Sequence, residues 1–106
     1  MVKLFKVIIS RQARQTLARI FGYYKEHASA EVAHKVRKGI LSEAQKLDRF
    51  PERGTILPTK KENENPRRYK KAWSFKIVYR VFKSKSEVRV IDIIHDKENP
   101  VKWDDL

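Results

Sequence analysis

The first ten residues alternate between apolar and polar positions, and the spacing then changes to that of a helix. In residues 2–9, VKLFKVII, the side chains of Phe5, Val7 and Ile9 fall on one face, which predicts a β-strand. Ser10 follows, and its side-chain oxygen can accept a hydrogen bond from a backbone N–H in the first turn of a helix. The pattern therefore predicts a strand that leads directly into a helix.

Two amphipathic helices with a very short connection are predicted in residues 10–50. The apolar stripe of the first consists of Ala13, Leu17, Ile20, Phe21 and Tyr24. Its opposite face carries Arg11, Arg14, Arg19 and Lys25. Ser29 can begin the second helix, whose stripe consists of Ala33, Val36, Ile40, Ala44 and Leu47. Gly39 inside the second helix predicts a close approach to the first, and Phe50-Pro51 ends the helix because proline cannot continue the hydrogen-bond ladder.

The rest of the chain predicts a loop and then three strands. Residues 51–66, PERGTILPTKKENENP, hold three of the four prolines and predict an exposed loop. Strands are expected at about 67–73, 75–83 and 86–95, with the polar turn KSKS between the last two. The chain is expected to leave the sheet at Asp96, and Trp103 to pack back onto the body. The expected core side of the middle strand consists of Trp73, Phe75, Ile77 and Tyr79, and the opposite side of Arg68, Lys76 and Arg80.

The element order β-α-α-β-β-β predicts an α+β fold in residues 1–106, which form one domain. The last three strands form an antiparallel meander, and the first strand joins them across the sheet. The two-helix hairpin then packs on one face of this small antiparallel sheet and buries both apolar stripes. The other face is expected to stay open, so that chemistry could take place there.

Composition adds a strong positive charge to this picture. The 106 residues include no cysteine, which excludes disulfides and thiolate chemistry, and their formal net charge is +12. Such a charge favours an anionic partner, either nucleic acid or an acidic protein. The apolar runs are far shorter than the roughly 20 residues of a membrane span. The N-terminal segment lacks the apolar core of a signal peptide, so a cytoplasmic protein with no membrane association is expected.

Three segments in order carry a family resemblance: VIISRQARQTLARIFGYY, LDRFPERG, and RRYKKAWSFKIVYRV followed by VRVIDIIHDKENP. Together they resemble the RelE/ParE toxin superfamily of type II toxin–antitoxin systems, also called plasmid stabilisation proteins, over about residues 3–100. The resemblance implies a small basic toxin held inactive by a cognate antitoxin, as a homodimer or a toxin–antitoxin hetero-oligomer. RelE-like members cleave messenger RNA on the ribosome, whereas ParE-like members inhibit DNA gyrase without nuclease chemistry. An inert, basic nucleic-acid-binding relative is a third alternative.

Metal-free RNA cleavage requires a base, cations that stabilise the crowded phosphate, and an acid. The histidines His27, His34 and His95 are too scattered to chelate a metal, so no metal and no cofactor are expected. The resemblance makes Lys76, Arg80 and His95 the catalytic candidates of a metal-independent endoribonuclease. Its candidates for phosphate binding are Arg68, Lys60, Lys61, Lys70 and Lys71.

Several residues depart from the nuclease pattern. Lys76 stands where arginine could fork a phosphate, and no carboxylate stands out as a base. A shift of one residue in the strand register would move His95 to the other face. A nuclease should bring Arg68, Lys76, Arg80 and His95 within about 8 Å of one another. A protein-binding toxin should instead have scattered or ion-paired cations and use the basic helix face of Arg11, Arg14 and Arg19.

Overall fold

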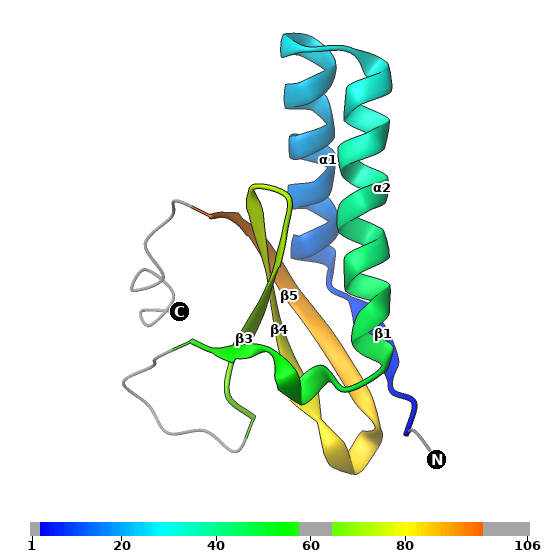
Figure 1. Cartoon of the computed structure of the whole chain (residues 1–106), viewed down its shortest axis with the longest axis vertical. Coiled ribbons are helices and arrows are strands. Elements are labelled where there is room, and N and C mark those ends of the chain that lie inside the picture. The colour runs from blue at the N-terminus through cyan, green and yellow to red at the C-terminus, as the bar shows by residue number, and fades with distance from the viewer. Residues whose placement is uncertain (1–2, 58–64, 97–106) are drawn as a thin grey trace.

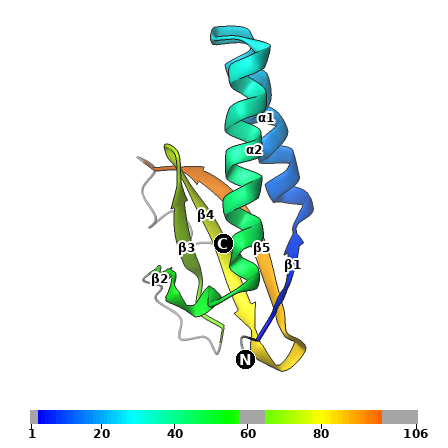
Figure 2. The same ribbon diagram turned by 45° about the vertical axis from the view of Figure 1, so that its right-hand side comes forward.

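The computed structural model describes residues 3–57 and 65–96, and it has the α+β fold that the sequence predicts. Five strands form one sheet in the order β1-β5-β4-β3-β2, and two helices lie side by side on one face of it (Figure 1, Figure 2). The helical hairpin extends beyond the sheet at the end where α1 turns into α2 (Figure 1).

The first strand and the two helices begin as predicted. Strand β1 spans Lys6–Ile9, and α1 spans Arg11–His27. Ser10 is the N-cap of α1: its Oγ accepts a hydrogen bond from the backbone N–H of Ala13 at 3.1 Å. Ser29 caps α2, which spans Ala30–Gln45, in the same way. Both helices therefore begin where a serine can satisfy a backbone donor of the first turn.

The second helix ends earlier than predicted. Helix α2 stops at Gln45, and a 3₁₀ turn, η1, continues over Lys46–Asp48 before the chain reaches Phe50. Leu47, expected on the stripe of the helix, lies in this turn and is still buried. Phe50 adopts a left-handed backbone conformation with φ of 49°, so the chain turns sharply there. A second 3₁₀ turn, η2, spans Pro51–Arg53.

The sheet is mixed rather than purely antiparallel. Strands β3 (Arg68–Ala72), β4 (Phe75–Phe82) and β5 (Glu87–His95) form the predicted antiparallel meander, with the 3₁₀ turn η3 (Lys83–Lys85) between the last two. Strand β1 pairs with β5 in parallel, which makes it one edge of the sheet. The segment predicted to be a loop contains η2 and a two-residue strand, β2 (Thr55–Ile56), which pairs with β3.

The main core lies between the helices and the sheet. It is built from the helix stripes and from the inward-facing residues of β4 and β5, including Phe75, Ile77 and Tyr79. The expectation of an open opposite face was wrong. Leu57, Val78 and Ile94 form a second, smaller buried cluster there, against which Tyr69 packs.

Trp73 does not belong to the core, contrary to prediction. It lies in the turn between β3 and β4, with φ of 58° and 59% of its surface exposed. A Cβ atom added at Gly39 would collide with the Trp73 indole. The close approach at Gly39 therefore comes from this turn, and the prediction that it comes from the first helix was wrong. Trp103, expected to pack on the body, lies outside the described residues.

Candidate functional site

Lys76 and Arg80 lie on the sheet face opposite the helices, as their phase on β4 predicts. The Nζ of Lys76 is 3.7 Å from Oδ1 of Asp96 and lies 4.9 Å from the centre of the Tyr69 ring. Only 13% of the Lys76 side chain is exposed. Four residues of an extended strand separate the Cα atoms of Lys76 and Arg80 by about 13 Å. The two cations therefore lie at different places on this face.

Arg80 lies among other arginines. It is directly opposite Arg89 of β5, and Arg67 precedes the β3 residue that pairs with Tyr79. Burial lowers the pKa of Arg80, and the nearby charge of Arg67 lowers it further. The Nε of Arg80 is buried and has no hydrogen-bond partner among the described residues.

Arg68 lies on the other face, so the expectation that it shares a side with Lys76 and Arg80 was wrong. The strand register places Arg68 directly opposite Tyr79, and residues opposite one another in an antiparallel pair share a face. Its Nη1 donates to the carbonyl oxygens of Glu52 at 2.9 Å and Gly54 at 3.0 Å. Arg68 thereby ties the turn η2 to the sheet.

His95 lies on the face of Phe75, away from Lys76. The two rings meet edge to face, with their centres 5.5 Å apart. Next to the turn, Phe82 pairs with Glu87, and this register, if it continued unchanged, would place His95 on the face of Lys76. A bulge between Val78 and Tyr79 shifts the register by one residue, so that His95 pairs with Phe75 and lies on its face.

The remaining predicted phosphate ligands are lysines of β3 and of the loop before it. Lys70 is held by Glu43 of α2, with an Nζ–Oε2 distance of 2.9 Å. Lys71 is exposed, and its Nζ is 3.9 Å from Oδ1 of Asp96. Lys60 and Lys61 lie outside the described residues.

A basic pocket of about 630 Å³ lies beside β3, where the two 3₁₀ turns meet this strand. The cations that line it are Lys46, Arg49, Arg53, Lys70 and Lys71. Phe50 adds an aromatic ring to the wall. Of these cations only the two β3 lysines were predicted from the sequence, because the segment KLDRFPER has no periodic pattern that marks Lys46, Arg49 and Arg53 as neighbours.

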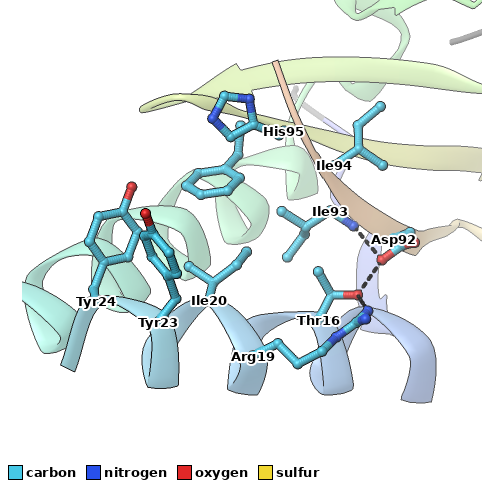
Figure 3. A pocket seen from close by; sticks show the side chains of 10 residues that line it. Thr16, Arg19, Ile20, Tyr23, Tyr24, Asp92, Ile93, Ile94 and His95 are labelled. Atoms are coloured by element: carbon cyan, nitrogen blue, oxygen red, sulfur yellow. Dashed lines mark hydrogen bonds between the residues drawn. The ribbon is translucent and has the colours of Figure 1, made fainter. Parts of the chain in front are cut away.

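An apolar groove of about 660 Å³ runs between α1 and β5 (Figure 3). Tyr23 and Tyr24 lie at one end of it, and Thr16 and Asp92 at the other. Its remaining lining residues are Arg19, Ile20, Phe75, Ile93, Ile94 and His95.

Asp92 fixes one end of the groove and was not singled out from the sequence. Its carboxylate is buried and accepts hydrogen bonds from the Thr16 hydroxyl at 2.7 Å, the Gln12 amide at 2.9 Å and the backbone N–H of Ile93 at 2.7 Å. These bonds satisfy a charge that would be costly to bury alone. Its place in the alternating pattern VRVIDIIH does not distinguish it from a solvated residue.

The part of the chain that the structure describes contains neither a metal-binding cluster nor a membrane-spanning helix. Residues 3–57 and 65–96 contain no cluster of three or more histidine, aspartate or glutamate side chains placed to hold a metal ion. Neither described helix is both long and apolar enough to cross a membrane.

Comparison with known proteins gives a consistent result. A family model described as "ParE toxin of type II toxin-antitoxin system, parDE" matches residues 7–100. No curated protein matches the chain. Among solved structures, a chain of the chromosomal ParDE system from P. aeruginosa has a similar fold, with a TM-score of 0.72 and 20% identity over 88% of this chain and 97% of that one. A chain of the toxin–antitoxin complex RelBE2 from Mycobacterium tuberculosis gives a TM-score of 0.61 and 16% identity over 87% of this chain and 91% of that one.

Proposed function

Because the chain belongs to the ParE toxin family of type II toxin–antitoxin systems, we propose that it arrests growth by binding a protein target such as DNA gyrase. In this proposal it does not cut RNA. The observation that carries the proposal is the placement of the candidate nuclease residues. Lys76 and Arg80 lie on one face of the sheet, while Arg68 and His95 lie on the other.

This placement disfavours a nuclease centre. A catalytic base or acid must come within about 2.6–3.2 Å of the proton that it transfers, either directly or through one water. A single phosphate could not meet the imidazole of His95 and the ammonium group of Lys76 from opposite faces of β4 and β5. Metal-free cleavage of messenger RNA, the alternative for this superfamily, would therefore need a different set of groups.

Existing contacts of the cations also support a binding protein. Arg68 already donates to two backbone carbonyls, and Lys70 is paired with Glu43. The Lys76 ammonium is close to Asp96. Each of these cations would have to leave a partner within the protein to hold a scissile phosphate, which raises the free energy of the bound state.

We place the contact with the target on the exposed face of α1. Arg11 and Arg14 are exposed there and suit an acidic protein surface. Arg19 is directed toward the groove, where its Nη2 donates to the Thr16 hydroxyl at 3.1 Å. The proposed target and the alternative, the ribosome, are both cytoplasmic, and we propose the same location for the toxin.

A cognate antitoxin is the second proposed partner, and the groove between α1 and β5 suits it. Ile20 and Tyr23 offer apolar surface, and Tyr23 is 59% exposed. Strand β1 pairs with β5 only as far as Val90, so no described strand covers the outer edge of β5 beyond the bulge. An antitoxin segment could fill the groove with apolar side chains and hydrogen-bond to this edge.

The function can be tested by measuring both activities of the same preparation. DNA supercoiling by purified gyrase is followed with increasing toxin, and transcript 5′ ends are mapped after expression in a bacterium. We expect inhibited supercoiling and intact transcripts. Cuts between codons with unaffected gyrase would overturn the proposal in favour of messenger RNA cleavage, and no growth defect would indicate an inert relative.

A pair of charge-matched variants separates the contact surface from net charge. Arg11→Gln/Arg14→Gln should raise the toxin concentration that half-inhibits supercoiling by about tenfold. Lys35→Gln/Arg37→Gln removes the same charge from exposed positions of α2 and should change it less than about twofold. Equal effects of the two pairs would show that the α1 face is not the contact.

A further inference from the structure

The basic pocket beside β3 has features that neither the fold nor the proposed target contact requires. Five cationic residues line it: Lys46 from η1, Arg49 from the link between η1 and η2, Arg53 from η2, and Lys70 and Lys71 from β3. They surround one concavity, so their fields add inside it.

The positive charge of this pocket is only partly neutralised. Glu43 pairs with Lys46 and Lys70, each with an N–O distance of 2.9 Å, and these two lysines lower the pKa of Glu43. Arg49 and Arg53 are exposed, and no ion pair is found for either among the described residues. The pocket therefore keeps cations that can meet an anionic ligand without first leaving a carboxylate.

An exposed aromatic ring lies in the wall of the same pocket. Half of the Phe50 surface is exposed, and the Arg53 guanidinium lies over the ring, 4.2 Å from its centre. The backbone of Phe50 is left-handed, which is unfavourable for a large side chain. Such a strained conformation persists only where the surroundings hold it, and it occurs often at ligand-binding positions.

The neighbouring contacts hold this conformation in place. The buried Tyr79 hydroxyl donates to the Pro51 carbonyl at 2.6 Å, and Arg68 donates to the carbonyls of Glu52 and Gly54. The turn that follows Phe50 is thus fixed to the sheet at three carbonyl groups. The aromatic ring and its arginine are held on a rigid support.

We propose that the basic pocket binds single-stranded nucleic acid. Arg49 and Arg53 contact successive phosphates, and an unpaired base stacks on the Phe50–Arg53 pair. A groove of cations that follows the backbone, combined with an aromatic platform, is how proteins hold single strands without sequence preference. An acidic peptide would use the cations but has no need of the ring, so the exposed Phe50 favours a nucleic acid.

The pocket is suited to binding and not to cleavage. Its described lining contains no histidine and no carboxylate, and the Tyr79 hydroxyl is already bonded to a backbone carbonyl. The inference goes beyond the proposed function, since it holds whichever process the toxin blocks. RNA and DNA share the phosphodiester chemistry, and the test below distinguishes them.

The test is fluorescence anisotropy of the full-length chain with labelled oligo-dT and oligo-U of about 12 nucleotides, titrated at several salt concentrations. Arg49→Gln/Arg53→Gln should weaken binding of at least one of them by about tenfold or more. It should also reduce the slope of log K against log salt by about 1.4. Lys35→Gln/Arg37→Gln is matched in charge and should weaken binding less than about twofold.

Phe50 provides a test that does not depend on charge. Phe50→Ala should weaken binding by about tenfold, while Phe50→Tyr, which keeps the ring, should bind nearly as well as the original chain. A thermal unfolding curve for each variant checks that it is folded. Equal losses for the two charge-matched pairs, or full binding by Phe50→Ala, would overturn the proposal. Displacement of the oligonucleotide by a glutamate-rich peptide that needs Arg49 and Arg53 but not Phe50 would assign the pocket to a protein partner.

Discussion

Replacing Tyr79 by phenylalanine removes one hydroxyl group from the point where the turn η2 meets the sheet. Tyr79 is completely buried, and its hydroxyl donates a 2.6 Å hydrogen bond to the Pro51 carbonyl. Gly54 packs so closely on this hydroxyl that an added Cβ would collide with it. The substitution therefore leaves a buried acceptor without this donor and opens a small gap beside Gly54.

The expected cost is the loss of a buried hydrogen bond. Leaving a buried acceptor unsatisfied costs about 1–3 kcal/mol, and about 1–2 kcal/mol remains if the turn relaxes slightly. For a domain of this size, the melting temperature should fall by about 4–8 °C for each kcal/mol. Gly54→Ala should cost more, because the Tyr79 ring has no space into which it can move. In the Tyr79→Phe background Gly54→Ala should cost less, since the Tyr79 hydroxyl oxygen that would collide with the new Cβ is absent.

Urea unfolding followed by circular dichroism measures all three variants. Tyr23→Phe is the matched control, because Tyr23 is 59% exposed and should tolerate the change within about 0.5 kcal/mol. An unfolding free energy for Tyr79→Phe equal to that of the control would refute the importance of this hydrogen bond. Strict additivity of the Gly54 and Tyr79 changes would refute the close contact between them.

The pH dependence of the same variant has a definite sign. Burial raises the pKa of Tyr79, although the nearby positive charge of Arg68 opposes this shift. The native state therefore favours the neutral phenol, and this stabilisation is complete below the unfolded pKa of about 10 and decreases above it. The difference in unfolding free energy between the wild-type protein and Tyr79→Phe should shrink as the pH rises from about 9 to 11. A constant difference would contradict a raised pKa of Tyr79 in the native state.

Three further predictions concern contacts elsewhere in the fold. Asp92→Ala should cost about 3 kcal/mol in urea unfolding, because the buried Thr16 hydroxyl loses its acceptor, and Asp92→Asn should cost clearly less; equal costs would contradict this. Lys70 and Lys46 lower the pKa of Glu43. The original chain should therefore lose more stability than Glu43→Gln as the pH falls from about 5 to 3, and parallel curves would count against the ion pairs. Gly39→Ala should shift tryptophan emission, because the new Cβ displaces an indole, and change stability by less than about 1 kcal/mol; an unchanged spectrum would exclude that contact.

Local patterns in the sequence predicted the helices well. The apolar stripes and the capping serines depend on residues three or four positions apart, so Ser10 and Ser29 could be identified directly. Contacts between distant segments leave no such pattern. The indole of Trp73 packs on Gly39 because a hairpin turn reaches α2, and the alternation of β4 contains no information about that turn.

The candidate site was harder to predict, because the face of a strand residue depends on register. One extra residue in β5, Ile91, shifts the pairing between the turn and His95. Without this bulge His95 would share a face with Lys76, as a nuclease requires. Both registers are compatible with the sequence, because nothing in VRVIDIIH marks the bulge.

Arg68 shows how one misplaced residue changes the functional interpretation. On the face of Lys76 it would have been one of several phosphate ligands, but it donates instead to the carbonyls of Glu52 and Gly54. Those bonds and the Tyr79 hydroxyl hold the turn that carries Phe50 and Arg53. We therefore interpret Arg68 as a residue that supports the basic pocket by holding the turn η2 in place, without contacting the ligand. If so, Arg68→Met should weaken oligonucleotide binding only as far as it loosens this turn. Phe50→Ala should then have little further effect in the Arg68→Met background, because the two changes act on the same support.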